Sequence, residues 1–503
     1  MSLKQQKVPL FYDRVNQNLL EVQFMAGFSQ IVPMAILIEF TDDSRYDILD
    51  SVFLHQFTGS RTVLARAAAV SSCKILFENL STELDSLYSF GFDFVLNENA
   101  PLEESFSIAS VIMTLSDGSR LRAEAASGFR YRPLLLLRAA GQDHCHTYRI
   151  PGLVTTNTGT LIAVYDARYH NSKDLQEDVD IAMSRSTDGG QHWEAMKVIM
   201  DMGEWGGRPQ NLNGVGDPSI LYDPNRHTLW VAALWLSGSQ PDKALWWESQ
   251  PGMEPHETGQ FMLVKSTDDG LSWSQPINIT GQIKDPAWQL LLAGPGRGIT
   301  LEDGTLVFPA QFKSDLGVQA IDGGKYTCQS TIVFSRDGGL SWTIGKGAKP
   351  NTTEAQVVQL EDGALMLNMR DDLNRRQKGN DNGRAIAISR DMGNSWALHP
   401  SSNHALIEPN CMASLINVKS DKGSFLLFSN PADVFERRNM TVKASFDEGL
   451  SWPEEHQILL NENIGFGYSC LSLTNDGCVG IVYEGESALF FQKIPLTEFV
   501  INR

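Results

Sequence analysis

The 503-residue chain has few cysteines, no long apolar segment and no apolar N-terminal run. Its six cysteines form no Cys-x-x-Cys pair, which argues against a metal site and against a disulfide framework. Only Cys470 and Cys478 are close enough in sequence to suggest pairing, and we expect buried thiols at both. No run of about 18 apolar residues exists, so we expect no membrane-spanning segment. The first residues, Met-Ser-Leu-Lys-Gln-Gln, lack the apolar core of a signal peptide.

Basic residues are also scarce relative to acidic ones. The chain has 41 Lys and Arg against 60 Asp and Glu, which gives a formal net charge of −19. This balance argues against nucleic acid and against an anionic membrane surface as partners. A local cluster of arginines is therefore informative, because it has to form against the field of the whole protein.

After residue 150 the sequence shows little of the apolar periodicity that is typical of long helices.

A short pattern, Ser-x-Asp-x-Gly-x-x-Trp, occurs five times, and we call each copy a box. The Asp accepts backbone N–H bonds within a turn, the Gly supplies a positive φ, and the Trp packs as an apolar plug between neighbouring sheets. Because the boxes solve a folding problem, we expect them to lie away from any active site. The five boxes begin at Ser186, Ser266, Ser335, Ser389 and Ser445.

A second set of turns supports a repeating all-β architecture. Each contains a Gly and precedes an apolar run, as expected for a tight turn within one sheet. Successive boxes start 80, 69, 54 and 56 residues apart, and each interval has room for a few strands. We therefore predict a six-bladed β-propeller over residues 140–503. The turns are Thr156–Gly159, Leu301–Gly304, Leu360–Gly363 and Thr474–Gly477.

Residues 1–130 contain no box but several alternating apolar runs, such as Ala35–Ile38 and Phe106–Met113. Alternation of this kind is typical of strands with one buried face. We predict a separate, smaller β-sandwich-like domain here. It is either an accessory carbohydrate-binding domain or a structural or docking domain.

The segment Tyr148-Arg149-Ile150-Pro151 lies shortly before the first box. Together with the boxes it resembles the sialidase (neuraminidase) family of glycoside hydrolases, in particular bacterial exo-α-sialidases with an N-terminal accessory domain. The resemblance covers about residues 143–495. It implies an active site on the propeller axis, built from strand ends of several blades.

Sialic acid carries a carboxylate on its anomeric carbon, and the resemblance implies three arginines that bind it. Guanidinium groups give bidentate and permanently charged contacts, which Lys supplies less well. Arg149 matches the first family position and Arg370 the second. Arg437 and Arg438 both qualify for the third, and Arg437 is preferred for its distance to the last box.

The same carboxylate repels an Asp or Glu nucleophile, and sialidases use a tyrosine instead. Tyr468 lies where the family places this nucleophile, and Glu354 matches the base that takes the phenol proton. Outside the resemblance, Tyr468 would be a packed strand aromatic and Glu354 a solvated loop acid.

The acid/base is expected to be Asp174, six residues after Arg168, which is a further substrate contact by resemblance. Asp178 and Asp180 are nearby competitors, and Asp180 is interpreted as structural. Removal from solvent is expected to raise the pKa of Asp174 so that it is protonated near the working pH.

Two further carboxylates match family roles. Glu484 would accept from Arg149 and fix its orientation, and Asp217 resembles an aspartate on the N-acetyl side of the pocket or is an ordinary Asp-Pro turn. The segment Gly238–Gly259, with Trp246-Trp247, departs from the repeat and is either a loop over the site or packing between blades. His144 and His146 lack a third metal ligand.

The sequence thus predicts a retaining exo-α-sialidase that releases terminal sialic acids from sialylated glycans, without cofactor or metal. Transfer to another sugar, or release of an anhydro product, would use the same residues, so these reactions stay open. A non-catalytic sugar-binding propeller is the alternative from a different class. We expect no nucleic-acid partner and no membrane insertion, and a periplasmic or secreted location, with no signal peptide in this sequence; whether a leader was removed is left open. The oligomeric state is left open.

Overall fold

The computed structural model describes the chain except for residues 13, 27–30, 59, 69–72, 83–85, 242, 421–422 and 501–503. Contacts divide the chain into two compact units. The first comprises Met1–Leu135, Ile458–Asn463 and Gln492–Ile494. The second comprises Leu136–Gln457, Ile464–Phe491 and Pro495–Arg503. No helix in the described part of the chain has the length and apolar character needed to cross a membrane.

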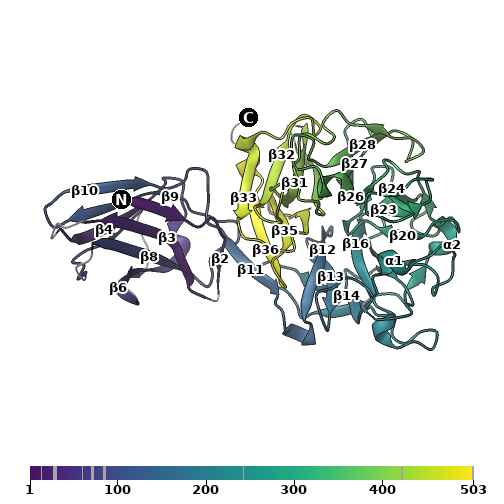
Figure 1. The fold of residues 1–503 in the computed structure, drawn as a ribbon, viewed down its shortest axis with the longest axis horizontal. Coiled ribbons are helices and arrows are strands. Elements are labelled where there is room, and N and C mark those ends of the chain that lie inside the picture. The colour runs from purple at the N-terminus through teal and green to yellow at the C-terminus, as the bar shows by residue number, and fades with distance from the viewer. Residues whose placement is uncertain are drawn as a thin grey trace. The chain divides into compact units, whose positions relative to one another are not determined.

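The first unit contains two antiparallel sheets that share one core (Figure 1). On β8, alternate residues from Tyr88 to Leu96 are buried in this core, because successive side chains of a strand point to opposite faces. The sheet order is β1-β3-β8-β5-β6 for one sheet and β10-β9-β4-β7 for the other. Their bounds are β1 Ser2–Gln5, β3 Asn16–Met25, β4 Pro33–Phe40, β5 Leu49–Phe57, β6 Arg61–Ala68, β7 Lys74–Phe77, β8 Leu87–Leu96, β9 Ile108–Leu115 and β10 Arg120–Glu124. The short β2 (Leu10–Phe11) pairs with the start of β11 (Pro133–Arg138), and η1 spans Tyr46–Ile48.

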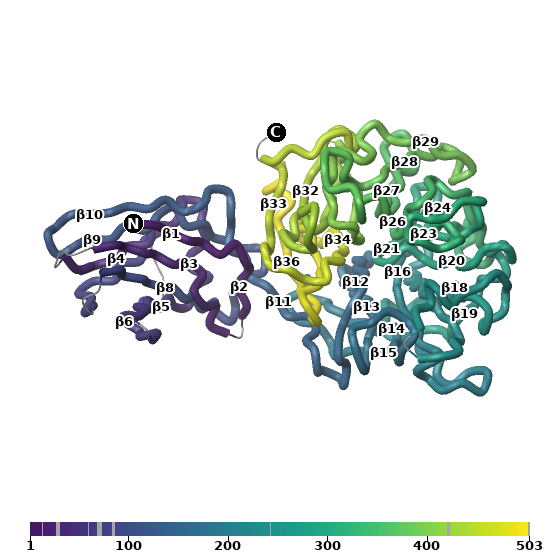
Figure 2. Tube along the Cα trace, in the orientation of Figure 1, coloured from purple at the N-terminus to yellow at the C-terminus, as the bar shows by residue number. Residues whose placement is uncertain are grey.

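After residue 140 the described strands form six sheets of mainly antiparallel pairs, which follow one another in chain order (Figures 1 and 2). The first sheet contains β12 Thr147–Thr155, β13 Leu161–Arg168, β14 Val179–Ser186 and β15 Lys197–Met200. The second contains β16 Val215–Asp223, β17 Thr228–Trp235, β18 Gln260–Ser266, β19 Ile277–Asn278 and β21 Gly296–Arg297. The third contains β20 Leu290–Ala293, β22 Ile299–Thr300, β23 Leu306–Ser314, β24 Thr327–Ser335 and β25 Thr343–Ile344. The fourth contains β26 Thr352–Gln359, β27 Leu365–Asp371, β28 Ala385–Ser389 and β29 Ala397–Leu398. The fifth contains β30 Ser414–Ser420, β31 Gly423–Pro431, β32 Met440–Ser445 and β33 Gln457–Asn461. The sixth contains β34 Ser469–Leu473, β35 Cys478–Glu484 and β36 Leu489–Pro495.

Helices are short and lie between strands. They are α1 Leu245–Glu248, α2 Thr280–Ile283, α3 Thr497–Val500, η2 Gln142–His144, η3 Gln210–Leu212, η4 Asp372–Arg375 and η5 Glu454–His456. Strands therefore dominate the described chain, and the all-β prediction is confirmed. Cys470 and Cys478 lie buried on β34 and β35, and both are thiols, as expected.

Each box has the turn chemistry predicted for it. In the box at Ser335 the Ser hydroxyl bonds Asp337 at 2.8 Å, the N–H of Gly339 donates to Ser335 Oγ at 2.8 Å, and the N–H of Ser341 donates to Asp337 at 2.9 Å. The box glycines have φ between 77° and 94°, a region that other residues occupy at a cost. Trp342 is buried between neighbouring sheets, where it contacts Trp230 and Phe308.

Candidate active site

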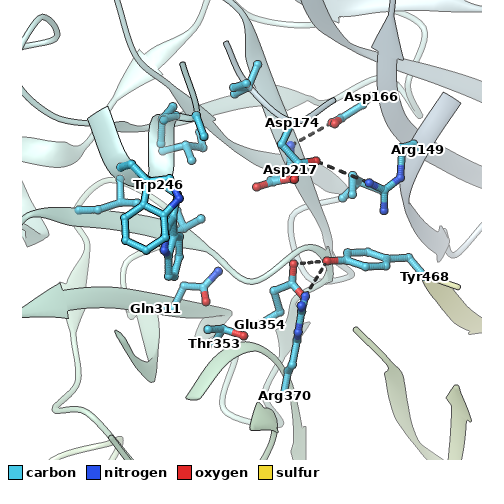
Figure 3. Close-up of a pocket in the computed structure, with 18 of the residues that line it drawn as sticks. Arg149, Asp166, Asp174, Asp217, Trp246, Gln311, Thr353, Glu354, Arg370 and Tyr468 are labelled. Carbon is cyan, nitrogen blue, oxygen red and sulfur yellow. Dashed lines mark hydrogen bonds and ion pairs between the residues drawn. The ribbon is translucent and has the colours of Figure 1, made fainter. Parts of the chain in front are cut away.

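The second unit contains a cavity of about 360 Å³ lined by residues from many of its sheets (Figure 3). Strand ends contribute most polar side chains, and the described lining includes no box residue. In the view of Figure 3, Trp246 lies on the other side of the cavity from Arg149 and Tyr468. The predicted site residues in the lining are Arg149, Arg168, Asp174, Asp217, Glu354, Arg370, Arg437 and Tyr468.

Tyr468, just before β34, donates a hydrogen bond from its phenol to the Glu354 carboxylate. Arg370 Nη1 lies 3.1 Å from the phenol oxygen and 2.6 Å from Glu354 Oε2, so one guanidinium contacts both groups. Burial raises the pKa of Tyr468 well above its ordinary value, and the Glu354 charge adds to this, against Arg370 and Arg437. The phenol is therefore neutral in the unliganded protein, and Glu354 is the base within reach of its proton.

Asn410 holds Arg370 in this position. Its Oδ1 accepts from Nη2 and Nε of Arg370 at 2.9 and 3.2 Å, and its Nδ2 donates to the carbonyl of Asp371 at 3.0 Å. Sequence analysis missed Asn410, since it lies in a connecting segment without a motif. The guanidinium of Arg370 is thus fixed from one side, with Glu354 and Tyr468 on the other.

Arg149 enters the cavity from a bulge in β12. The register with β13 shifts between Arg149 and Gly152, and Ile150 adopts φ of 58°. This conformation is unusual for a β-branched residue and costs about 1–3 kcal/mol. The Ile150 N–H compensates in part by donating to Glu484 at 2.8 Å. The bulge therefore allows the Arg149 side chain and the Ile150 N–H to contact the same carboxylate, that of Glu484.

Glu484, at the end of β35, is fully buried and binds three groups. Its carboxylate accepts from Arg149 Nε at 3.1 Å and from Arg149 Nη2 at 3.4 Å. It also accepts from the N–H groups of Ile150 and Tyr468, the latter at 2.9 Å. Glu484 does not line the cavity among the described residues, and it joins the backbone of Tyr468 to the side chain of Arg149.

Asp174 differs from its predicted environment. Its side chain is 76% exposed, and Arg168 Nη1 donates to Oδ1 at 2.9 Å while Arg149 Nη1 lies 3.5 Å away. Desolvation raises the pKa of Asp174, but the Arg168 and Arg149 charges outweigh it and hold the pKa below its ordinary value. The prediction of a raised pKa is therefore wrong for the unliganded protein, because two guanidinium groups stabilise the carboxylate.

Arg168 is itself buried and occupied on three sides. Its Nε and Nη2 donate to Asp166 Oδ2 at 3.1 and 2.7 Å, and its Nη1 donates to the carbonyl of Ser172 at 2.7 Å. Asp166 stands two residues earlier on β13, on the same face of the strand. This spacing was a signal that sequence analysis did not use. Arg168 thus holds the loop that carries Asp174 as well as the Asp174 carboxylate.

Asp217 lines the cavity from a second bulge, at the start of β16. Its φ is 59° and its N–H donates to Asp166 Oδ1 at 2.9 Å. Burial raises the pKa of Asp217 well above its ordinary value, and the charges of Asp166, Asp174 and Glu354 add to this. A protonated Asp217 presents an O–H donor to the cavity in addition to an acceptor.

The competitors of Asp174 lie outside the described cavity lining. Asp180, on β14, accepts from the Tyr169 hydroxyl at 3.0 Å, and burial together with the charges of Asp201 and Asp178 raises its pKa to about 7. A pKa near neutrality alone does not make Asp180 the acid/base, because Asp180 is absent from the described cavity lining. Geometry separates it from Asp174.

Arg437 lines the cavity, and Arg438 is absent from its described lining. Arg437 Nη1 donates to the carbonyl of Phe466 at 2.9 Å and Nη2 to that of Asn410 at 3.2 Å. Arg438 lies 3.7 Å from Glu436 instead. Of the two candidates for the third arginine, Arg437 is therefore the one beside Arg149 and Arg370.

The departing segment after β17 forms α1, which lines the cavity with Trp246 and Trp247. Trp246 Nε1 donates to Asp322 Oδ2 at 3.0 Å, and Lys313 Nζ lies 3.4 Å from the same atom. Both indole rings lie over the Lys313 ammonium, at 4.1 and 4.7 Å from their centroids. Leu245 packs into a buried cluster, so α1 both covers the site and fills space.

The remaining described lining includes residues that no sequence motif marked. They are Asp166, Leu175, Leu234, Leu290, Leu292, Gln311, Asp322, Thr353 and Arg375, whereas Ile150 belongs to the Tyr-Arg-Ile-Pro motif and Ala244 and Leu245 to the segment Gly238–Gly259. His144 and His146 are not among the described lining residues. No cluster of His, Cys, Asp and Glu suited to a metal ion occurs in the described part of the chain.

Comparison with known sequences gives a consistent result. The BNR repeat-like domain family matches residues 159–481. A sialidase of Bacteroides fragilis (strain YCH46) is 48% identical over 400 residues, which cover 78% of this chain and 70% of the relative. A sialidase of Paraclostridium sordellii is 29% identical over 71% of this chain and 85% of its own length.

Solved structures show the same similarity. Hadza microbial sialidase Hz136 is 36% identical and covers 98% of this chain and 99% of its own, with a TM-score of 0.84. Trypanosoma rangeli sialidase in complex with 2,3-difluorosialic acid, a covalent intermediate, is 19% identical over 73% of this chain and 59% of its own, with a TM-score of 0.57. The second similarity shows the fold alone. Together with the series of sheets, these matches identify a β-propeller.

Proposed function

Because this chain belongs to the sialidase family of glycoside hydrolases, we propose that it is a retaining exo-α-sialidase acting through a tyrosyl intermediate. Its substrates are terminal sialic acids of glycoproteins, glycolipids and oligosaccharides. The observation that carries this proposal is the hydrogen bond from Tyr468 to Glu354 in a cavity that also holds Arg149, Arg370 and Arg437.

Substrate binding begins with the carboxylate on the anomeric carbon. Arg149, Arg370 and Arg437 supply three guanidinium groups, each fixed from behind by a protein acceptor. Fixed donors lose little entropy on binding, so the carboxylate is held in one orientation. The anomeric carbon beside it then faces Tyr468. The arginines also stabilise this carboxylate while the ring flattens toward an oxocarbenium-like state.

Attack by Tyr468 requires loss of the phenol proton. Glu354 accepts that proton through the existing hydrogen bond, and the phenolate oxygen forms a bond to the anomeric carbon. Arg370 contacts both oxygens and stabilises the negative charge as it moves from Glu354 toward the phenol. The glycosidic C–O bond breaks in the same step, and its electron pair leaves with the aglycone oxygen.

Asp174 protonates that leaving oxygen. Its carboxyl has to hold a proton when substrate is bound, although Arg168 and Arg149 favour the carboxylate in the free protein. The substrate carboxylate places a negative charge beside Arg149, which offsets this field and raises the pKa of Asp174. Asp174, then ionised, takes a proton from water, and the water oxygen forms a bond to the anomeric carbon as the bond from that carbon to Tyr468 breaks. The released phenolate of Tyr468 takes its proton back from Glu354. Two inversions give overall retention.

The other predicted residues fit supporting roles. Glu484 orients Arg149 through its two-point contact. Asp217 lines the cavity, and we assign it to the N-acetyl side of the sugar. Arg168 is buried behind Asp174, so we assign it to positioning Asp174 in addition to substrate contact.

The scaffold completes the proposal. We propose that the six sheets are the blades of a six-bladed propeller over residues 140–503, and that residues 1–130 form a β-sandwich-like accessory domain. Sialylated glycans lie mainly outside the cytoplasm, so we propose a periplasmic or secreted location. Sialylated glycans are the proposed partners, without nucleic acid or membrane insertion.

The test is hydrolysis of a fluorogenic aryl sialoside, with and without a planar 2,3-dehydro sialic acid. We expect cleavage that the planar compound inhibits. Proton NMR during turnover of 3′-sialyllactose then identifies the product: α-sialic acid first for a retaining hydrolase, a new sialoside for transfer when lactose is added in excess, and an anhydro sugar for the third reaction. No cleavage of either substrate would leave the sugar-binding alternative.

A further inference from the structure

A further guanidinium group, that of Arg375, lines the cavity. Arg375 is the last residue of η4, five residues after Arg370, and its side chain is 48% exposed. Its Nε donates to Asp372 Oδ1 at 2.9 Å. Within the described residues, neither terminal nitrogen of Arg375 has a hydrogen-bond partner. The terminal N–H groups of Arg375 are therefore open to solvent or to a bound molecule.

The position of Arg375 is fixed by a buried anchor. Asp371 caps η4 by accepting from the N–H of Leu373 at 3.0 Å. Its other oxygen accepts from Lys349 Nζ at 2.8 Å and from Asn403 Nδ2 at 2.9 Å. Arg370 immediately precedes this anchor on β27. The backbone that carries Arg370 and Arg375 is thus held by the contacts of Asp371.

Binding of a single substrate carboxylate does not require Arg375, because other arginines of the cavity are already assigned to it. Arg149, Arg370 and Arg437 already surround that group, and Arg168 is paired with Asp166 and Asp174. Asp322, another lining acid, faces Lys313 and Trp246. The acidic partner of Arg375 is Asp372, whose side chain is 3% exposed. Arg375 contacts it through Nε alone.

We propose that Arg375 binds a second anionic group of the substrate, a carboxylate or a sulfate, and so favours sialosides that carry two negative charges. The proposal rests on the proposed sialidase function. Guanidinium groups bind carboxylate and sulfate oxygens with two parallel N–H bonds, and no protein contact occupies the terminal nitrogens of Arg375 among the described residues. Two sources share this chemistry: a second sialic acid in an α2,8-linked pair, and a sulfate ester on the sugar next to the sialic acid.

The experiment compares kcat/KM for three substrates: 3′-sialyllactose, α2,8-disialyllactose and a 3′-sialyl-N-acetyllactosamine with a 6-sulfate. We expect Arg375→Gln to lower kcat/KM about tenfold for at least one doubly charged substrate, through KM, and to leave 3′-sialyllactose unchanged. The substrate that responds identifies the source of the anion. Added salt should reduce the difference between wild type and Arg375→Gln, because the contact is partly exposed.

Two variants serve as controls. Arg376→Gln removes the neighbouring charge, which bonds the carbonyl of Ile321 at 3.2 Å and is absent from the described cavity lining, and it should change none of the three values. Arg375→Lys keeps the charge without the two-point contact and should recover part of the loss. Equal effects of Arg375→Gln on all three substrates, or no effect on any, would overturn the inference. If the wild type cleaves none of them, the proposed function fails with it.

Discussion

Arg168 Nη1 lies 2.9 Å from Asp174 Oδ1 and the same nitrogen lies 2.7 Å from the carbonyl of Ser172. One buried guanidinium thus fixes both the backbone of the loop and the carboxylate at its end. This contact keeps Asp174 ionised in the unliganded protein and makes its proton affinity depend on neighbouring charge. The pH dependence of the enzyme should therefore respond to Arg168.

Replacing Arg168 with Gln removes the largest charge that lowers the pKa of Asp174. The pKa of Asp174 then rises. Because the acid has to be protonated, kcat/KM for a natural sialoside falls as pH rises through that pKa. We expect this limb of the pH profile to move to higher pH in Arg168→Gln, even though activity is lower. An unmoved limb, with an unchanged circular dichroism spectrum, would mean that another group titrates.

Asp174→Asn removes the proposed proton donor while keeping shape and hydrogen-bond capacity. Aryl sialosides with good leaving groups need little protonation, whereas natural glycans need it fully. We expect kcat for 3′-sialyllactose to fall about 10²–10⁴-fold, and the aryl substrate to lose much less. Equal losses on both substrates would count against Asp174 as the acid.

Tyr468→Phe removes the proposed nucleophilic oxygen and the donor to Glu354. Turnover should fall by several orders of magnitude, because no other side chain takes over covalent attack. Binding of the planar 2,3-dehydro compound, measured by calorimetry, should persist since the arginines remain. Near-normal turnover, or loss of binding together with turnover, would refute the nucleophile assignment.

Arg149→Lys keeps a positive charge beside the proposed position of the substrate carboxylate but loses the planar guanidinium group. The Glu484 contacts through Nε and Nη2 are lost as well. Charge-assisted hydrogen bonds contribute about 1.5–3 kcal/mol each, so we expect affinity for the planar inhibitor to fall roughly 10–100-fold. Unchanged affinity would show that charge alone is sufficient at this position.

Lys313 is buried, and its pair with Asp322 holds Trp246. Removing one partner of a buried pair costs about 3–5 kcal/mol, since the other charge stays desolvated. Lys313→Met should therefore lower the free energy of unfolding measured by urea titration. Lys325→Met is the matched control, because the Lys325–Asp315 pair is exposed, and it should leave stability unchanged. Similar stability of both variants would contradict this account.

Stability at low pH should depend on the boxes. Hydrogen bonds from Ser341 and the backbone lower the pKa of Asp337 from 3.8 to about 2. A lowered folded-state pKa contributes stability above pH 3.8, and that contribution is lost as pH falls from 3.8 toward 2. The Tm difference between wild type and Asp337→Ala should therefore shrink over this interval. A constant difference would mean that the carboxylate charge is not responsible.

Short sequence motifs allowed much of the fold and of the candidate site to be predicted. What they missed depends on contacts that form only in the folded chain. The boxes and the Gly turns encode local hydrogen bonds and positive φ, so short sequences specify them. Tyr468, Glu354 and Arg149 stand beside recognisable patterns. Asn410 has no such pattern, because its contact with Arg370 depends on two segments that meet only in the folded chain. The pKa of Asp174 was predicted in the wrong direction because exposure and two nearby arginines are properties of the tertiary structure.

The contact between Glu484 and Arg149 joins residues 335 positions apart, near the beginning and the end of the propeller. Since the same carboxylate also receives the N–H of Tyr468, the catalytic geometry depends on closure of the ring. A nascent chain in which β35 has not yet left the ribosome has most of its sheets but lacks the Glu484 carboxylate. Catalysis should therefore begin only after synthesis is nearly complete.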